Sequence, residues 1–457
     1  MDNKKTHSLS HARELLLIWV IGIAGQLCWN LENFWFNTFV YKNIGPYSSI
    51  VGWMVAISAI VTTFSTFFFG TISDRSGKRK HFIWLGYVIW GFFTIVFGFT
   101  GFLSKLDAQL WLVGTMVVLA DSVMSFFGSM GNDSGFNAWI ADIIDNKNKG
   151  SIGAALAIQP VIGTIIGTIL GGLLIQWFGY MAFFAIMGIM VSLIGLFAFF
   201  FLTDSPNLKP NKKGSFWSQF LESFDFRTFS RQKELMLVNI LAAIFFIGFN
   251  VYFVHIGNLF IYNYGFSEGD AGIIQGLGLI IAIIFTIPAG KAINNNKSPL
   301  IALIALIVNI VGLLELTFFA PSADSSNLIS IANIPLLIGV IVVGTGYVLF
   351  MQTAMVWNKS LYPEGTKGRF EGIRVIFFVL IPMVFGSLIA NPLIQTWGKD
   401  AIIEVAGVMR AGKAPSEVLF IAAAIITLFA FIPLYFVNRE FKKRIANESN
   451  LQVSLEE

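Results

Sequence analysis

The chain has 457 residues, of which 56% are hydrophobic and only 12% are charged, and its formal net charge is +4. This composition excludes an ordinary soluble globular domain, because such domains are about 25% charged. Apolar runs of about 20 residues recur along the chain, and each is long enough to cross a hydrocarbon core of about 30 Å. We therefore expect most of the chain to be solvated by lipid.

Twelve apolar segments predict twelve membrane-spanning helices. Gly and Pro lie inside many of them, which favours helices packed on other helices over the strands of a barrel. The single cysteine, Cys28, excludes an internal disulfide and a cysteine-based metal site, and we expect no cofactor. The predicted spans are 15–40, 50–72, 81–104, 109–141, 151–177, 181–203, 235–262, 270–292, 300–320, 334–357, 373–396 and 417–437.

The first span carries a polar and aromatic cluster. Asn30, Glu32 and Asn33 lie beside Trp29 and Trp35. A sugar site combines amides and carboxylates for hydroxyl groups with aromatic rings for C–H faces, so this cluster is a candidate substrate site. The alternative is an interfacial glutamate within a belt of tryptophans.

The loop after the second span reads G-T-I-S-D-R-S-G-K-R-K, from Gly70 to Lys80. Its cations either fix the topology and contact anionic headgroups or contribute to a latch between helices. Gly70 is expected to allow close helix packing, and Asp74 offers an acceptor to a neighbouring helix N-terminus.

The fourth span contains two carboxylates, and a charged group inside a membrane costs at least about 2.5–3.5 kcal/mol, so each needs a partner, a cavity or a proton. Asp133 lies within G-N-D-S-G, where small neighbours leave room for a ligand; the alternative is a structural hydrogen bond. Asp121 is a proton site or a packing residue. The two lie about 18 Å apart along a helix, too far for one small sugar to bridge.

Later spans add amides and one histidine. Gln159 lies on the fifth span, Asn250 on the seventh and Gln352 on the tenth. His255 is expected to be a polar residue with satisfied hydrogen bonds rather than a titrating site. Glycines on the fifth span predict a packing face against the eighth span, at Gly163, Gly167 and Gly171.

The chain divides at its longest polar stretch, and its halves resemble each other. We expect a six-helix bundle at 1–203, a cytoplasmic linker at 204–234 and a second bundle at 235–457. Trp139 and Lys149 match Trp357 and Lys367 at one offset of 218 residues. With both termini in the cytoplasm, 25 Lys and Arg lie inside and 5 outside, as the positive-inside rule requires.

The loop from Gly70 to Lys80 resembles the helix 2–3 signature of the major facilitator superfamily, G-x-x-x-D-R-x-G-R-R. The resemblance implies two bundles around a substrate site at the midplane. It also implies a cytoplasmic latch that helps to hold an outward-open state. The residues assigned to this latch are Gly70, Asp74, Arg75, Gly77, Lys149, Arg369, Glu371 and Arg374.

Several segments are similar to sucrose transporters and to the wider glycoside–pentoside–hexuronide:cation symporters. They include Q-L-C-W-N-L-E-N at 26–33, A-W-I-A-D at 138–142 and Y-P-E-G-T-K-G-R-F-E-G at 362–372. The melibiose-permease branch has a sugar-binding aspartate on helix 4, where Asp133 stands here, followed by Phe136 and Asn137. Gln159 lies near the place of an expected arginine. The second span has no acid, so the resemblance favours proton over sodium coupling.

The sequence thus predicts a secondary transporter in a bacterial plasma membrane that imports a sugar or glycoside with a cation, a proton in preference to sodium. Substrate binding is assigned to the first-span cluster with Asp133, Asn137, Gln159, Asn250 and Gln352, and coupling to Glu32, Asp121 and Asp133. The alternatives are an exporter of amphiphilic compounds and, from another class, a membrane-embedded sensor. No P-loop, HExxH or CxxC motif points to an enzyme. We expect a monomer with no nucleic-acid partner.

Overall fold

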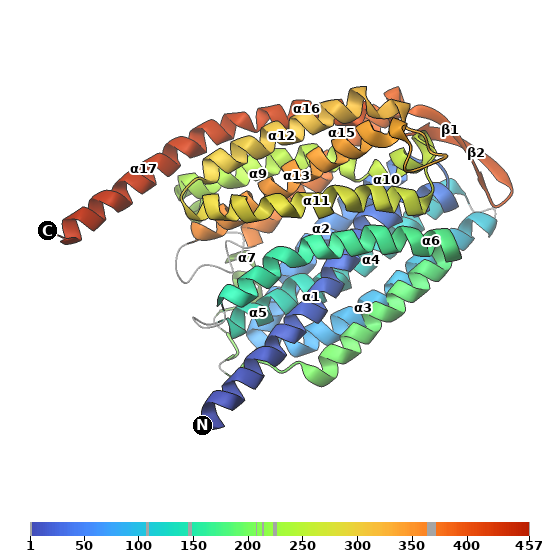
Figure 1. Ribbon diagram of the computed structural model, residues 1–457. Helices are drawn as coiled ribbons and strands as arrows, with labels where there is room; N and C mark the ends of the chain where they lie inside the picture. Colours follow the sequence, from blue (N-terminus) through green and yellow to red (C-terminus); the bar gives the residue numbers. More distant parts are fainter. Residues whose placement is uncertain are drawn as a thin grey trace. The chain divides into compact units, whose positions relative to one another are not determined.

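The computed structural model of the chain describes residues 2–106, 109–144, 149–206, 208–212, 214–222, 226–362 and 372–456. These residues are mostly helical (Figure 1). Within them, eleven helices are long and apolar enough to cross a membrane. The expected all-α membrane fold is therefore confirmed.

The fifth and sixth predicted spans are two helices that share the label α6, from Lys149 to Phe201. This element breaks at Gly179, whose φ of 78° and ψ of 169° are not helical. A left-handed φ favours glycine because other residues carry a Cβ that clashes there. The break divides the 44-residue apolar stretch Ile158–Phe201 into two passes, so the eleven helices supply the twelve predicted passes.

The chain folds as two compact units. Unit 1 comprises residues 1–220, 253–276 and 391–416, and unit 2 comprises residues 221–252, 277–390 and 417–457. Unit 1 thus contains two short segments from the second half of the chain. The boundaries fall inside α9 (Lys233–Phe253), α11 (Glu268–Asn294) and α15 (Ile381–Trp397), and α7 (Phe216–Glu222) ends just past the first boundary.

Unit 1 is built mainly from α1, α2, α3, α4 and α6. Its remaining described elements are short helical turns, one β-hairpin and the parts of α7, α9, α11 and α15 that fall within its boundaries. Besides α6, its elements are α1 (Asp2–Asn43), α2 (Ser48–Ser76), α3 (Lys80–Phe99), η1 (Thr100–Leu106), α4 (Leu110–Ser129), η2 (Met130–Phe136), α5 (Asn137–Ile143), α10 (Ile256–Asn258), η3 (Leu259–Asn263), β1 (Lys399–Val405) and β2 (Val408–Ala414).

Close helix packing in unit 1 depends on glycines of α3. A Cβ added to Gly91 would lie 2.2 Å from the carbonyl oxygen of Gly188 on α6, and one added to Gly86 would lie 2.5 Å from Cα of Gly131 on η2. Small residues let helix backbones approach closely, which is how membrane helices gain packing energy without a hydrophobic driving force.

The strands β1 and β2 form an antiparallel hairpin that the sequence analysis did not predict. Val405 pairs with Val408, and the two turn residues, Ala406 and Gly407, have φ values of 53° and 81°. Positive φ at both positions is typical of a two-residue type I′ turn. We distinguish two ends of unit 1. The hairpin end carries β1 and β2, and the basic end carries the turn between α2 and α3.

Unit 2 has a core of aliphatic and aromatic side chains that includes Phe245, Phe350 and Leu306. The rings of Phe245 and Phe350 stack with centroids 3.9 Å apart. Besides the parts of α9, α11 and α15, its elements are α8 (Phe226–Arg231), α12 (Ser298–Phe318), η4 (Ala320–Ser322), η5 (Ile331–Asn333), α13 (Ile334–Ser360), η6 (Ile376–Leu380), α16 (Val418–Phe429) and α17 (Phe431–Glu456).

The two tryptophans that carry the predicted internal repeat are placed alike within their own units. Trp139 and Trp357 are 1% and 2% exposed. The Trp139 indole donates a hydrogen bond of 2.9 Å to the Thr203 carbonyl, and the Trp357 indole donates one of 2.8 Å to the Glu234 carboxylate. In both cases the indole lies at the end of the fourth span of its half and binds a residue at one end of the predicted linker, 204–234.

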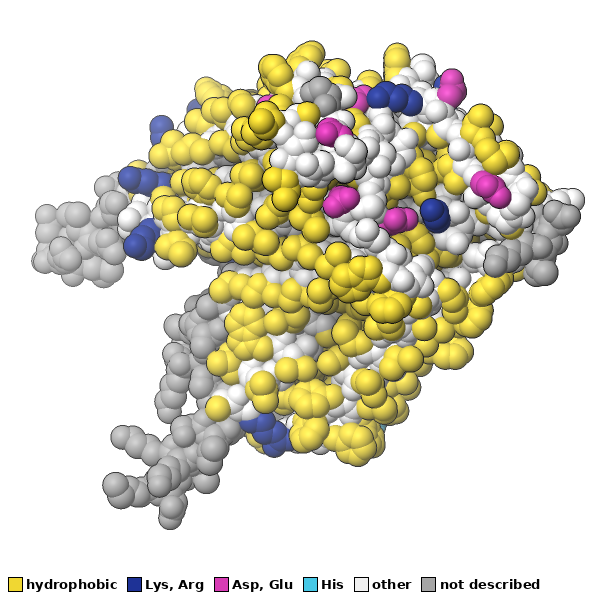
Figure 2. All heavy atoms as spheres, turned by 45° about the vertical axis from the view of Figure 1, so that its right-hand side comes forward, with side chains coloured by type: hydrophobic (Ala, Val, Ile, Leu, Met, Phe, Trp, Pro, Cys, Tyr) yellow, Lys and Arg dark blue, Asp and Glu magenta, His cyan; other side chains and the backbone are white. Residues whose placement is uncertain are grey.

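Large apolar side chains lie on the outer surface, as lipid contact requires. Trp53, Phe92 and Ile284 are each more than half exposed. Figure 2 shows hydrophobic side chains along the helices of the face in view, and the few charged side chains there stand apart from these apolar stretches.

Candidate functional site

Among the described residues of unit 1, the most completely buried carboxylates lie on α1 and α4. Glu32 is 6% exposed, and its Oε1 accepts hydrogen bonds of 2.7 Å from Ser58 and 2.8 Å from Ser125. Three helices therefore meet at one carboxylate oxygen. The second oxygen, Oε2, is buried without a hydrogen-bond partner.

Asp121 is 1% exposed, and its Oδ1 is likewise buried without a partner. The Ser58 hydroxyl also faces this carboxyl group. Ser125 lies one helical turn further along α4 and donates to the Asp121 backbone carbonyl at 2.8 Å. The structure thus brings together two predicted coupling residues, Glu32 and Asp121, and adds two serines that the sequence analysis did not name.

Hydroxyl groups continue along the contact between α2 and α4. Ser58 and Ser125 share a hydrogen bond of 2.8 Å, and Thr66 and Ser129 share one of 2.7 Å. Ser129 also donates to the Thr62 carbonyl at 2.9 Å. A spacing of four residues places these groups on one face of each helix. The hydroxyl ladder, defined by these five residues, extends from the carboxyl pair toward the basic end.

Asp133 lies in a different environment from the pair. It belongs to η2, a π-helical segment, is half-buried, and accepts a hydrogen bond of 2.9 Å from Asn132. Asn132 in turn accepts one of 3.0 Å from the Tyr87 hydroxyl. Asn137 is exposed and donates to the Asp133 backbone carbonyl at 3.3 Å. π-Bulges occur frequently at functional sites, where they redirect side chains.

One stripe in the middle of α1 stays partly accessible, whereas the other residues from Ala24 to Tyr41 are buried. The half-buried positions in its middle include Gln26, Trp29 and Asn33, which are three and four residues apart. This spacing places them in one stripe of the helix. The Asn33 amide is held by a hydrogen bond of 2.6 Å to the Trp29 carbonyl. We call these three residues the α1 stripe.

Two of the predicted substrate-binding amides in unit 1 have structural contacts. Asn30 is 6% exposed and packs against Gly167 of α6, one turn along from Gln26, which packs against Gly163 but remains half-buried. Gln159 is 2% exposed and donates to the Ile18 carbonyl at 2.8 Å. These contacts tie α6 to α1.

The predicted amides of unit 2 are bound to neighbouring backbone. Asn250 donates to the Phe246 carbonyl at 2.8 Å and packs against Gly386. Gln352 donates to the Thr286 carbonyl at 3.1 Å, and its Oε1 is buried without a partner.

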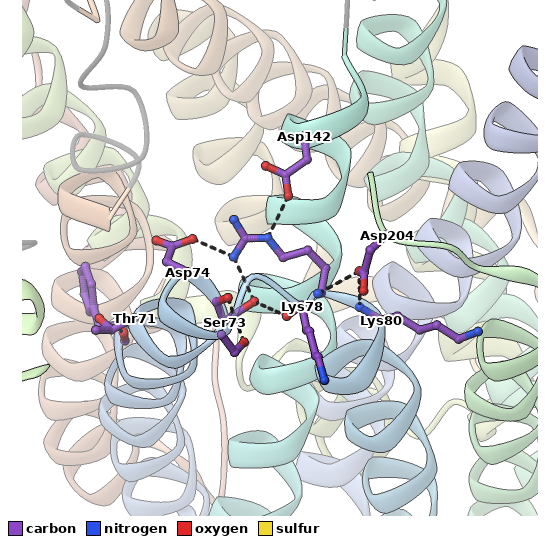
Figure 3. A network of polar contacts seen from close by, with 10 residues as sticks. Thr71, Ser73, Asp74, Lys78, Lys80, Asp142 and Asp204 are labelled. Atoms are coloured by element: carbon purple, nitrogen blue, oxygen red, sulfur yellow. Dashed lines mark hydrogen bonds and ion pairs between the residues drawn. The ribbon is translucent and has the colours of Figure 1, made fainter. Parts of the chain in front are cut away.

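At the basic end of unit 1, the centre of the charge network is Arg79, which the sequence analysis did not single out. Figure 3 labels its partners Ser73, Asp74 and Asp142. Its guanidinium lies 2.6 Å from Asp74 and 2.8 Å from Asp142, and it donates to the Ser73 hydroxyl at 2.9 Å. Burial acts to lower the pKa of Arg79, but the hydrogen bond to Asp142 and the charges of Asp74 and Asp142 raise this pKa above its usual value.

Asp204 completes this network from the linker after α6. Its Oδ1 accepts hydrogen bonds of 2.8 Å from the backbone N–H groups of both Arg79 and Lys80. These groups begin α3, so Asp204 caps that helix from a distant part of the chain.

Arg75 and Gly77 also contact the linker. Arg75 donates to the Gly214 carbonyl at 3.0 Å and to the Gln219 side chain at 3.1 Å. Gly77 ends α2 with a φ of 63°, and a Cβ there would lie 2.8 Å from the Pro210 nitrogen. Close packing at Gly70 was expected, but a Cβ there would find its nearest neighbour, Ser134 Oγ, at 3.8 Å, an ordinary contact.

The remaining latch residues are only partly described. Arg369, Glu371 and the Lys149 side chain lie outside the described residues. Arg374 contacts Met355 through a hydrogen bond of 3.5 Å to its sulfur and lies over the ring of Phe378, 5.5 Å from the centroid.

The glycine face of α6 packs against α1, not against the eighth span as expected. Cβ atoms added to Gly163, Gly167 and Gly171 would meet Gln26, Asn30 and Trp35, respectively. A neighbouring face of the same helix contacts α11, where Gly272 lies against the Thr168 carbonyl. Helical rotation of about 100° per residue separates these two faces.

Segments from the second half of the chain close the hairpin end of unit 1. The Tyr41 hydroxyl donates to the Lys413 carbonyl at 3.0 Å, and Ser48 donates to Asn391 at 2.8 Å. His255, expected to have satisfied hydrogen bonds, is fully buried, and neither of its ring nitrogens has a hydrogen-bond partner.

The sequence offers a signal for some of the missed residues. Ser58 lies four residues before Thr62 on α2, and Ser125 lies four residues before Ser129 on α4. Both pairs are polar residues inside apolar spans. Asp142 ends the A-W-I-A-D segment at 138–142, but the sequence assigned it no partner, and Asp204 carries no local signal; only the fold brings both to Arg79.

Twelve apolar passes with buried carboxylates, a hydroxyl ladder and a charged network at one end define a multi-pass membrane protein with an internal polar site. The family model described as Major Facilitator Superfamily matches residues 18–331 and 263–455. The chain therefore belongs to the major facilitator superfamily of membrane transporters. No curated protein matches it.

Solved structures share this fold at low sequence identity. A bacterial homologue of the human lysosomal transporter Spinster has a TM-score of 0.68 and 13% identity, covering 95% of this chain and 98% of that one. A D-xylose–proton symporter has a TM-score of 0.68 and 13% identity, covering 92% and 97%. The D323A mutant of the nucleoside transporter NupG has a TM-score of 0.66 and 12% identity, covering 93% and 99%.

Proposed function

We propose that this protein is a secondary transporter that imports a sugar or glycoside together with a proton by alternating access. The observation that carries the proposal is the α1 stripe, in which two amides flank an indole in the middle of a membrane helix. Amides bind sugar hydroxyl groups, and an aromatic ring packs against the apolar C–H face of a sugar.

Asp133 and Asn137 are the second part of the proposed site. Both retain exposure on the π-helical end of the fourth span, whereas Glu32 and Asp121 are almost fully buried. We assign sugar binding to the α1 stripe with Asp133 and Asn137. Asn30 and Gln159 support the helices that carry it, and Asn250 and Gln352 remain proposed contributors from unit 2.

The fold neighbours support this class of substrate without fixing it. Two are a D-xylose–proton symporter and a nucleoside transporter, and a nucleoside contains a sugar. Others are homologues of Spinster and of the iron transporter ferroportin, so the same fold carries other cargo. The resemblance of residues 26–33 and 362–372 to sucrose transporters and glycoside symporters favours the sugar.

The orientation, the division of the chain and the latch are part of the same proposal. The distribution of Lys and Arg favours cytoplasmic termini in a bacterial plasma membrane. The repeated tryptophans favour functional halves at 1–203 and 235–457 joined by 204–234. We propose that the protein works as a monomer and that the latch residues gate its cytoplasmic side.

The test is uptake of labelled mono- and disaccharides into proteoliposomes under an imposed proton or sodium gradient. We expect accumulation of at least one sugar under the proton gradient, with most of it lost in Asp133→Asn. The matched control is Asp400→Asn, which changes an 89%-exposed carboxylate on the hairpin. If the folded protein moves no sugar under either gradient, the proposal is wrong, and export of amphiphilic compounds becomes the next function to test.

A further inference from the structure

Glu32 and Asp121 form a pair of buried carboxyl groups that no cation neutralises among the described residues. They lie 89 positions apart in the chain, on α1 and α4, and both face the Ser58 hydroxyl. Each keeps one carboxyl oxygen that is buried without a hydrogen-bond partner. A buried, unpartnered acceptor is costly, so these two oxygens indicate a ligand that the pair takes up.

The other titratable groups around the pair do not supply a positive charge. Cys28 lies one turn before Glu32 on α1, and Asp133 on η2 is close enough to interact with Glu32 electrostatically. Tyr87 on α3 lies near Cys28 and Asp133. α2 contributes hydroxyl groups, and the described part of α6 that packs on α1 contributes glycines and Gln159.

Two carboxylates in a low-dielectric site cannot both ionise without a strong mutual repulsion. We propose that Glu32 and Asp121 share a single proton through the hydroxyl group of Ser58, and that this proton is the ion coupled to transport. The inference rests on the proposed transport function. The proton binds to the pair from one side of the membrane and leaves it on the other, with no covalent change.

The geometry favours a proton over a metal ion. The Ser58 and Ser125 hydroxyls donate to Glu32 Oε1, which leaves only the two unpartnered oxygens as new ligands. Hard cations such as Ca²⁺ and Mg²⁺ take about six or more oxygen ligands. The described residues contain no group of three or more His, Cys, Asp or Glu arranged to hold a metal ion.

The first test is infrared spectroscopy of the purified, substrate-free protein during a pH titration, which observes the C=O stretch of protonated carboxyl groups. We expect a titrating band that is lost in the Glu32→Gln/Asp121→Asn double variant. In each single variant the remaining acid no longer faces a second charge, so its band should titrate over a pH range that differs from that of the wild type. A wild-type titration in the double variant would overturn the proposal.

A serine pair separates the shared proton from general packing effects. Ser58→Ala removes the hydroxyl between the carboxyl groups and should change the titration of the band. Ser122→Ala is the matched control, because Ser122 lies on α4 and donates only to the Val118 carbonyl of its own helix at 2.7 Å. Equal titrations in both variants would contradict the bridging role of Ser58, and thermal unfolding verifies that each variant is folded.

The second test separates coupling from substrate binding. In Asp121→Asn we expect gradient-driven accumulation to be lost while exchange of labelled for unlabelled substrate continues, because exchange needs no net proton movement. Unchanged proton-driven accumulation in this variant would overturn the coupling role of Asp121. Accumulation by the wild-type protein that is driven by sodium alone would overturn the proton as the coupled ion. Failure of all sugars to move would refute the proposed substrate, whereas the infrared titration would still decide whether the pair shares a proton.

Discussion

Nη1 of Arg79 lies 2.6 Å from Oδ1 of Asp74, and the same guanidinium reaches Asp142 at 2.8 Å. The Arg79 side chain is only 7% exposed, whereas the two carboxylates retain more access to water. A buried arginine between two acids connects the end of α2, the start of α3 and the end of α5.

Replacing Arg79 by Ala should leave Asp142 without this partner and reduce the free energy of unfolding by roughly 2–3 kcal/mol, below the 3–5 kcal/mol of a fully buried pair. Thermal unfolding in detergent measures the loss. The control is Lys78→Ala, a neighbouring cation with an exposed side chain. Equal melting temperatures for the two variants would show that the network contributes little to stability.

Asp204 should stabilise α3 as an acceptor rather than as a charge. It accepts the N–H groups of Arg79 and Lys80, so Asp204→Ala is expected to cost about 1 kcal/mol or slightly more. Asp204→Asn keeps a side-chain oxygen and should retain most of the stability. If Asn destabilises as much as Ala in thermal unfolding, the negative charge and not the cap is the important feature.

Gly91 should tolerate no side chain, because a Cβ there would overlap the Gly188 carbonyl oxygen at 2.2 Å. Gly91→Ala must separate α3 from α6 and is expected to cost about 1–3 kcal/mol. Gly114→Ala is the comparison, since its nearest neighbour is the flexible end of the Ile50 side chain at 3.2 Å. The unfolding temperatures of the two variants should differ clearly, and similar values would argue against a tight α3–α6 contact.

The hairpin end must open if the proposed alternating access is right. Ser48 and Asn391 are joined by a hydrogen bond of 2.8 Å, so cysteines at these positions should cross-link in a Cys28→Ser background, which removes the only native cysteine. We expect the cross-link to block transport and reduction to restore it. Single-cysteine variants are the controls. Transport at the wild-type rate by the cross-linked protein would contradict opening at this end.

Hydropathy predicted the spans because each pass must form its backbone hydrogen bonds within its own helix and place apolar side chains in lipid. It did not predict the hairpin, although Gly407 between the β-branched residues Val405 and Val408 provides a local turn signal. The sequence assigned Glu32 and Asp121 to coupling as carboxylates within membrane spans, but their common contact with Ser58 depends on how three helices pack. Periodicity within one helix does not identify its neighbours, which also explains the wrong partner predicted for the glycine face of α6.

The single-residue break at Gly179 bears on how the protein is made. Trp177 and Phe178 beside it are 65% and 61% exposed, so this turn has aromatic side chains suited to the membrane interface and no polar loop to translocate. The two passes of α6 are therefore expected to leave the ribosome and enter the bilayer together, as a preformed helical hairpin. Biogenesis of this region would then depend on the turn itself rather than on the insertion of either pass alone.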